Sequence, residues 1–228
     1  MSAPIYQTST NNYAASTTTL TLTKPSAVKR GDMLYLLVGS DHSADETPQF
    51  TDNLTGWNLE IAEGNKTARA WIGVFSRLAD GTEGATESVV AADANNLLGL
   101  YIHVRNVEIS DPTHVIGTVS SNDANLTAQT ATSLTTTINN CLVISFIHSQ
   151  DSSLSPMTTA TSGWSMIENV TGTTGAMSIA TRELVTAGVS GDMVFTFNTP
   201  NANRSKAIQF ALAPHLNRAS AMMVGSSF

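Results

Sequence analysis

The sequence predicts an all-β protein, a single antiparallel β-sandwich of jelly-roll type built from two pseudo-repeated halves. Short apolar or alternating runs, separated by turn signals, recur along the chain as expected for many short strands. Threonine, serine and asparagine dominate the polar residues; threonine favours half-buried strands, and serine and asparagine favour turns. The motif order of the first half returns in the second at a spacing of about 107 residues, which matches Trp57 with Trp164.

The composition narrows the classes of function. With 228 residues, 41% of them hydrophobic, the chain can bury the core of one large β domain. The formal net charge of −7, with only 11 Lys and Arg, argues against a nucleic-acid partner, which needs a basic face. Neither a secretory signal nor an apolar run of about 20 residues is visible, so we expect no membrane partner. The single cysteine, Cys141, leaves no internal disulfide and lies in an apolar run, where we expect an inert side chain.

The first half begins with residues 1–16, a polar stretch that we expect to be an N-terminal arm with Tyr6 and Tyr13 as its large anchors. Residues 17–23 alternate strictly and predict a half-buried strand, which ends at a proline. A Gly-Asp turn leads into residues 33–38, an apolar run typical of a strand buried on both faces. Further strands are predicted at residues 57–61, 68–75, 87–90 and 97–104.

The second half follows the same order after a connector at residues 105–125. Strands are predicted at residues 131–138, 142–147, 175–184, 193–197 and 206–212. The connector lacks a spacer rich in Pro, Gly and Ser, so we predict one domain over residues 17–214. Its half-repeats are about 17–107 and 131–214. Pairing both halves in one sandwich covers faces that a single half of five or six strands would leave open. Residues 215–228 are expected to form a C-terminal tail.

No stretch of the sequence has the spacing of a catalytic, cofactor or metal site, so none is predicted. Residues 188–191 resemble the serine-hydrolase nucleophile motif but have the wrong spacing and suit a hairpin turn. The acid–base pairs that could be imagined follow buried strands, where solvated loop residues are expected anyway; they are His148 with Asp151 and Asp41 with His42. Asp41, Asp45 and Glu46 could together attract a cation such as calcium, but they lack the spacing of a known calcium loop.

Two further features have a functional and a structural interpretation. Arg30-Gly31-Asp32 spells an adhesive tripeptide, yet its Gly-Asp has the simpler role of turning the chain into the next strand. Trp57, Trp71 and Trp164 could stack on sugars. Because two of them recur at matched positions after a turn glycine, we predict that they plug the core.

A set of motifs recurs in a fixed order along the chain. In the first half they are Pro-Ser-x-Val-x-x-Gly-Asp-x-Leu from Pro25, Thr-Gly-Trp from Thr55 and Val-Phe-Ser-Arg-Leu-Ala-Asp-Gly from Val74. An Asn-Val-x-x-x-Asp-Pro-Thr connector follows, and the second half contributes Thr-Thr-x-Asn-Asn-x-Leu-Val-Ile, Ser-Gly-Trp, Thr-Ala-Gly-x-Ser-Gly and a closing Ala-Leu-Ala-Pro. This order resembles a duplicated β-sandwich family found in many tailed-bacteriophage virion proteins, among them head decoration proteins, head fibres and tail appendages. The motifs cover residues 17–214 and are signatures of a fold; the family offers no catalytic residues.

The resemblance implies a non-enzymatic virion structural protein, assembled in the cytoplasm of a bacterial host. A short chain without extra domains suits a capsid decoration (cement) protein on the outer head surface, bound to the major capsid protein or other virion proteins. A homotrimer is the first expectation, since capsid threefold positions invite one. The two ends of the chain would supply interface contacts through Tyr6, Tyr13, Met222, Met223 and Phe228.

Two alternatives stay open. The first is a tail-tip or fibre protein that binds host surface glycan. The second is an enzyme on a sandwich scaffold, whose turnover would depend on His42 or His148. Because the residues that the halves share are expected to be core, any specific function should lie where they differ, in the loops after Val38 and Ile147 and at the two ends.

Overall fold

The computed structural model describes residues 2–41, 49–65, 69–122, 127–150, 157–158, 161–197 and 204–215. Strands in these ranges are β1 Ile5–Thr23, β2 Met33–Ser40, β3 Asn58–Asn65, β4 Ala70–Leu78, β5 Thr86–Arg105, β6 Thr113–Ile116, β7 Ser120–Asn122, β8 Ala128–Ala131, β9 Cys141–Ser149, β10 Ser165–Thr171, β11 Ala176–Leu184, β12 Met193–Thr196 and β13 Ser205–Leu212. All pair antiparallel. No helix long and apolar enough to cross a membrane occurs in the described ranges.

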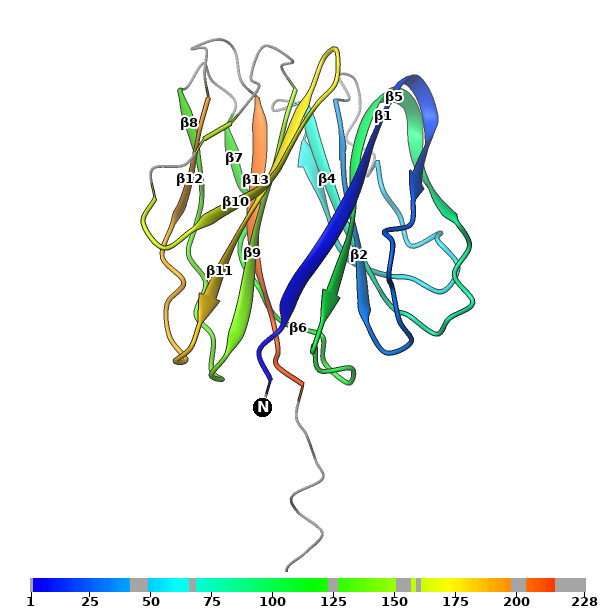
Figure 1. The fold of residues 1–228 in the computed structure, drawn as a ribbon. Coiled ribbons are helices and arrows are strands. Elements are labelled where there is room, and N and C mark those ends of the chain that lie inside the picture. Colours follow the sequence, from blue (N-terminus) through cyan, green and yellow to red (C-terminus); the bar gives the residue numbers. More distant parts are fainter. Residues whose placement is uncertain are drawn as a thin grey trace, which may run out of the picture.

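The strands form two sheets that pack face to face as a β-sandwich, which confirms the predicted fold class (Figure 1). The first sheet has the order β1-β5-β2-β4-β3, and the second has the order β10-β11-β9-β13-β6, with β7 also paired to β13. The remaining strands, β8 and β12, form a separate two-stranded ribbon. Each sheet is therefore built from one half of the chain.

The two sheets have the same strand order, which shows the duplication directly. Read from one edge, β3-β4-β2-β5-β1 of the first half corresponds to β10-β11-β9-β13-β6 of the second. The edge strands even share a β-bulge, at Glu60 in β3 and at Ile167 in β10, 107 residues apart. A bulge twists an edge strand and interrupts the row of unpaired N–H and C=O groups along it. The edge strands β3 and β10 are therefore protected in the same way against pairing with a further strand.

Three apolar clusters hold this arrangement together. The central cluster lies between the sheets and is shared by both halves; it includes Tyr35, Leu37, Ile144, Phe146, Ile208 and Phe210. The other face of the first sheet packs under Leu20, Leu22, Phe50 and Trp57. The other face of the second sheet packs under Met193, Phe195, Phe197 and Trp164. All eight residues of β2 and all nine of β9 are buried, because each strand has packed layers on both sides.

The N-terminal segment differs from the expected arm. β1 begins at Ile5 rather than at residue 17, and Ile5 to Ala14 pair with residues 97–105 of β5. β1 and β5 thus form one long ribbon, which rises along the molecule and bends over at its upper end (Figure 1). The predicted short strand at residues 87–90 is part of this continuous β5. In the second half the equivalent ribbon is interrupted. The short strands β6, β7 and β8 take the place of β1, and β12 and β13 take the place of β5.

The strand predicted at residues 131–138 is wrong. β8 ends at Ala131, and beyond it only an isolated bridge joins Thr135 to Val189. The backbone of this segment instead bonds to a turn, through Thr136 N to Gly188 O at 2.9 Å and Ser190 N to Leu134 O at 2.9 Å. Threonine-rich composition favours strand locally, but the segment has no strand partner along its length.

Candidate functional site

Tyr6 and Tyr13, which the sequence suggested as interface anchors, are used within the chain. Both rings are half-buried and pack against the central cluster. Tyr6 Oη donates to Ser9 Oγ at 2.8 Å, and Ser9 Oγ donates to Glu168 Oε1 of β10 at 2.6 Å. The two rings thus close the side of the sandwich where β1 faces the second half.

Tyr13 makes the second contact across this side. Its hydroxyl donates to Asn96 Oδ1 at 3.3 Å and also bonds Thr173 Oγ1. A Cβ at Gly172 would lie 2.3 Å from the Tyr13 ring, so the ring lies directly on the glycine backbone. Both tyrosines therefore bind the two halves together. The other predicted interface residues, Met222, Met223 and Phe228, lie outside the described residues, and their role stays a prediction.

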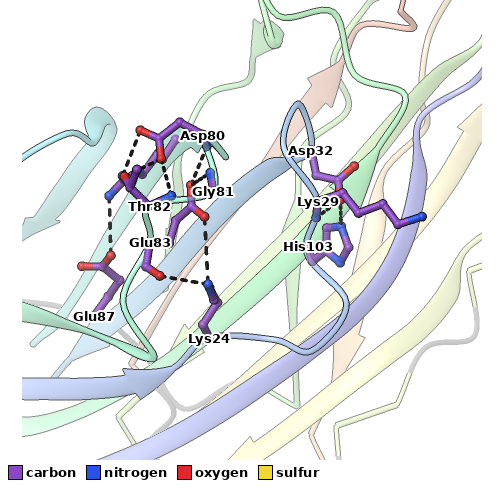
Figure 2. Close-up of polar contacts among 10 residues, drawn as sticks. Lys24, Lys29, Asp32, Asp80, Gly81, Thr82, Glu83, Glu87 and His103 are labelled. Atoms are coloured by element: carbon purple, nitrogen blue, oxygen red, sulfur yellow. Dashed lines mark hydrogen bonds and ion pairs between the residues drawn. The ribbon is translucent and has the colours of Figure 1, made fainter.

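The turn between β4 and β5 carries a charged network at the lower end of Figure 1. The Glu83 carboxylate accepts from the backbone of Asp80 at 2.6 Å and of Gly81 at 3.2 Å, and Lys24 Nζ donates to Glu83 O at 3.0 Å (Figure 2). Arg77 pairs with Glu87 at 3.6 Å. Hydrogen bonds from Thr82 lower the pKa of Asp80 to about 2. The network satisfies its own charges and fixes the turn.

The equivalent turn of the second half, between β11 and β12, has fewer charged residues. Ser190 takes the place of Glu83, 107 residues later, and donates to Gln209 Oε1 at 2.6 Å. The guanidinium of Arg182 in β11 donates to Ser190 O at 2.6 Å. Val185 and Val189, on either side, are 70% and 62% exposed. The two turns thus differ in chemistry: the first is fixed by a charged network, and the second carries two exposed valines.

Asp32 of the Arg-Gly-Asp tripeptide is buried. Its Oδ2 lies 2.7 Å from His103 Nε2 and 3.4 Å from Arg105 Nε, and accepts from Lys29 N at 2.7 Å (Figure 2). Burial lowers the pKa of His103, and Asp32 opposes that shift. Gly31 has φ +91°, so Gly-Asp forms the turn into β2 as expected. An aspartate held in this way is not presented to a receptor.

His148 lies between the two sheets rather than in a solvated loop, which corrects the expectation for this residue. It is the penultimate residue of β9, is fully buried, and packs against Gly39 of β2. Its ring nitrogens face the backbone of Ser40 and Ala176, without a well-aligned hydrogen bond to any described residue. Burial lowers the pKa of His148 to about 4, so the imidazole is neutral at pH 7. Its proposed partner Asp151 lies outside the described residues.

The acidic loop after β2 is described only at Asp41. Its carboxylate accepts from Asn96 N and Nδ2, both at 3.1 Å, and burial raises its pKa. His42, Asp45 and Glu46 lie outside the described residues. No group of three or more His, Cys, Asp or Glu that could hold a metal occurs in the part of the chain that the structure describes.

The tryptophans and the cysteine lie in the core. Trp57, Trp71 and Trp164 are only 4%, 4% and 7% exposed, and Trp57 and Trp164 plug equivalent outer clusters. Cys141 is buried, and burial raises the pKa of its thiol. Gly56 and Gly163, which precede two of the tryptophans, have φ +79° and +83°, so the Gly-Trp motif is a turn followed by a core plug in both halves.

One pocket was not anticipated from the sequence. It has a volume of about 470 Å³ and lies at the lower end, between the connector, the segment before β9 and the end of β13. Its lining combines Glu108, Asp111 and His114 with Ile138, Ala213 and Pro214. No signal in the sequence indicated this pocket, because its wall comes from three segments far apart in sequence.

A comparison of the chain with protein-family models, curated protein sequences and solved structures found no match.

Proposed function

We propose that the protein is a non-enzymatic structural component of a tailed-bacteriophage virion and that it decorates the outer surface of the head. The observation that carries the proposal is the placement of the motifs behind the family resemblance. In both halves the Gly-Trp motif forms a turn and a core plug, and the buried turn residues Glu83 and Ser190 occupy equivalent places. Because each motif has the same structural role in both halves, the motifs support a duplicated structural domain rather than a catalytic site.

The partners in this proposal are the major capsid protein and further copies of the chain, arranged as a trimer. Cyclic symmetry suits a protein bound at threefold positions of a capsid lattice. The face most suited to a partner is the lower end of the second half, because Val185 and Val189 are exposed there. At 70% and 62%, these two valines are the most exposed of the large apolar side chains in the described part of the chain.

Copy number per particle tests the proposal. Quantitative mass spectrometry of purified particles should find the protein at roughly hundreds of copies, in proportion to the capsid protein. Roughly three to a dozen copies would instead indicate a tail location. Absence from particles would refute the virion proposal altogether.

The glycan-binding alternative has less support. In the sequence this alternative depended on tryptophans that could stack on sugars. All three tryptophans are buried and cannot form such a surface. A glycan array probed with the purified protein should therefore show no binding that depends on Trp57 or Trp164.

A further inference from the structure

We propose that a second pocket, where β1 begins, binds a small carboxylate ligand with an apolar body, and that the guanidinium of Arg182 holds the carboxylate. This inference goes beyond the proposed function and does not depend on it. The pocket has a volume of about 460 Å³ and lies among β1, β9, β10 and β11, close to the N-terminus in Figure 1. A volume of this size is typical of sites for small molecules, which span roughly 300–1,000 Å³.

The guanidinium of Arg182 is held in place within the pocket wall. Its Nη1 donates to Ser190 O at 2.6 Å, and a Cβ at Gly163 would lie 3.3 Å from its Cζ, so the group lies flat against the glycine. In the described part of the chain, Nε and Nη2 donate to no other residue. These two nitrogens form a fork that can donate two parallel hydrogen bonds to one carboxylate. A guanidinium that is already positioned loses little conformational entropy when it binds.

The first half contains a guanidinium in the same setting, but with carboxylate partners. A Cβ at Gly56 would lie 3.6 Å from Arg77 Cζ, as at Gly163 and Arg182. Arg77 forms ion pairs with Asp80 at 3.5 Å and with Glu87 at 3.6 Å. Arg182 forms no ion pair with any residue in the described ranges. The first half thus supplies this guanidinium with the chain's own carboxylates, whereas in the second half it is available to a ligand.

The rest of the lining defines the body of the ligand. Ile5, Leu142 and Ile167 form an apolar wall, and Ile5 is 49% exposed, so part of this wall is accessible. Glu183 also lines the pocket and is exposed; it follows Arg182 in β11, so the two side chains leave opposite faces of the strand. The negative charge of Glu183 opposes a second anionic group on the ligand. The ligand class is therefore a monocarboxylate with an apolar body, such as an N-acylated apolar amino acid.

An NMR titration of the isotope-labelled full chain with N-acetyl-leucine tests the proposal. The Nε–H signal of Arg182, identified by its loss in Arg182→Lys, should shift with a dissociation constant in about the millimolar range, as expected for a ligand of this size. N-acetyl-leucinamide has the same body without the charge, and it should bind roughly tenfold more weakly. No shift of the Arg182 signal at about 10 mM N-acetyl-leucine, or equal binding of the amide, would overturn the proposal.

Two neighbouring substitutions should change the affinity in opposite directions. Arg182→Lys keeps the charge but loses the fork, so N-acetyl-leucine should bind roughly tenfold more weakly. Glu183→Gln removes a repulsive charge at an exposed position and should tighten binding about twofold to threefold. Glu63→Gln is the matched control, because it changes the net charge equally at an exposed position of the first half; it should bind as the wild type does. If Arg182→Lys does not fold, Glu183→Gln decides: an affinity no higher than that of Glu63→Gln would contradict a carboxylate bound beside Glu183.

Discussion

His148 makes a quantitative prediction about stability below neutral pH. The imidazole is fully buried between the sheets, and burial lowers its pKa from 6.5 to about 4. Between these values the unfolded chain binds a proton that the folded chain excludes. Stability is therefore complete above about pH 6.5 and falls as the pH decreases towards 4. The linkage relation gives a loss of about 2.5 kcal/mol at pH 4.5 relative to pH 7.

The assay is urea unfolding followed by tryptophan fluorescence at several values between pH 7.5 and 4.5, a window of roughly three units chosen to span the titration. His148→Leu should remove this loss, because leucine fills the site with an apolar side chain that does not titrate. His114→Asn, at a half-buried position, is the matched control for the loss of one histidine, and an equal change in that variant would show that the effect is not specific to His148.

Comparison with the variant separates His148 from its neighbours. His103, whose pKa is also lowered by burial, adds a loss of the same sign. Asp41, whose pKa is raised, gains stability as the pH falls and opposes it. Both are present in wild type and variant, so the difference curve isolates His148. A difference that changes by less than about 1 kcal/mol across the window would refute the buried, neutral histidine.

The packing of the two halves makes two more predictions, both measured as the free energy of unfolding in urea. Gly39→Ala would place a Cβ 2.4 Å from the His148 ring, so we expect a loss of about 1–3 kcal/mol that largely disappears in a His148→Ala background; equal losses in both backgrounds would contradict the contact. Trp57→Ala and Trp164→Ala should each cost about 3–5 kcal/mol, because both empty an outer cluster. A cost below about 1 kcal/mol for either would show that it does not plug the core.

The fold could be predicted because its signals are local and repeated. The apolar run of β2 and its counterpart in β9 are visible in the sequence, and each is buried on both faces. The recurrence of Trp57 at Trp164 predicted a duplication, and the common strand order of the two sheets bears it out. Repetition strengthens weak strand signals, since each half is independent evidence for the other.

The first strand could not be predicted over its full length. Residues 5–16 contain few apolar side chains, so no periodicity marks them as a strand. They are ordered by pairing with β5, some 80 to 100 residues away, and by Tyr6 and Tyr13 against the second half. Such long-range pairing leaves no mark in a local window of sequence.

The site was the least predictable part. The residues that stood out in the sequence, Asp32, His148 and the tryptophans, are buried in the scaffold. The features that did not stand out in the sequence are the exposed Val185 and Val189 and the pocket beside Glu108. Their exposure follows from the differences between two equivalent turns and from three segments that meet only in the folded chain.

A low-resolution electron micrograph of particles that carry a gold-labelled copy of the protein tests the central claim most directly. The account predicts label on the outer surface of the head, at positions that repeat with the capsid lattice. Label confined to the tail, or particles without label, would contradict it.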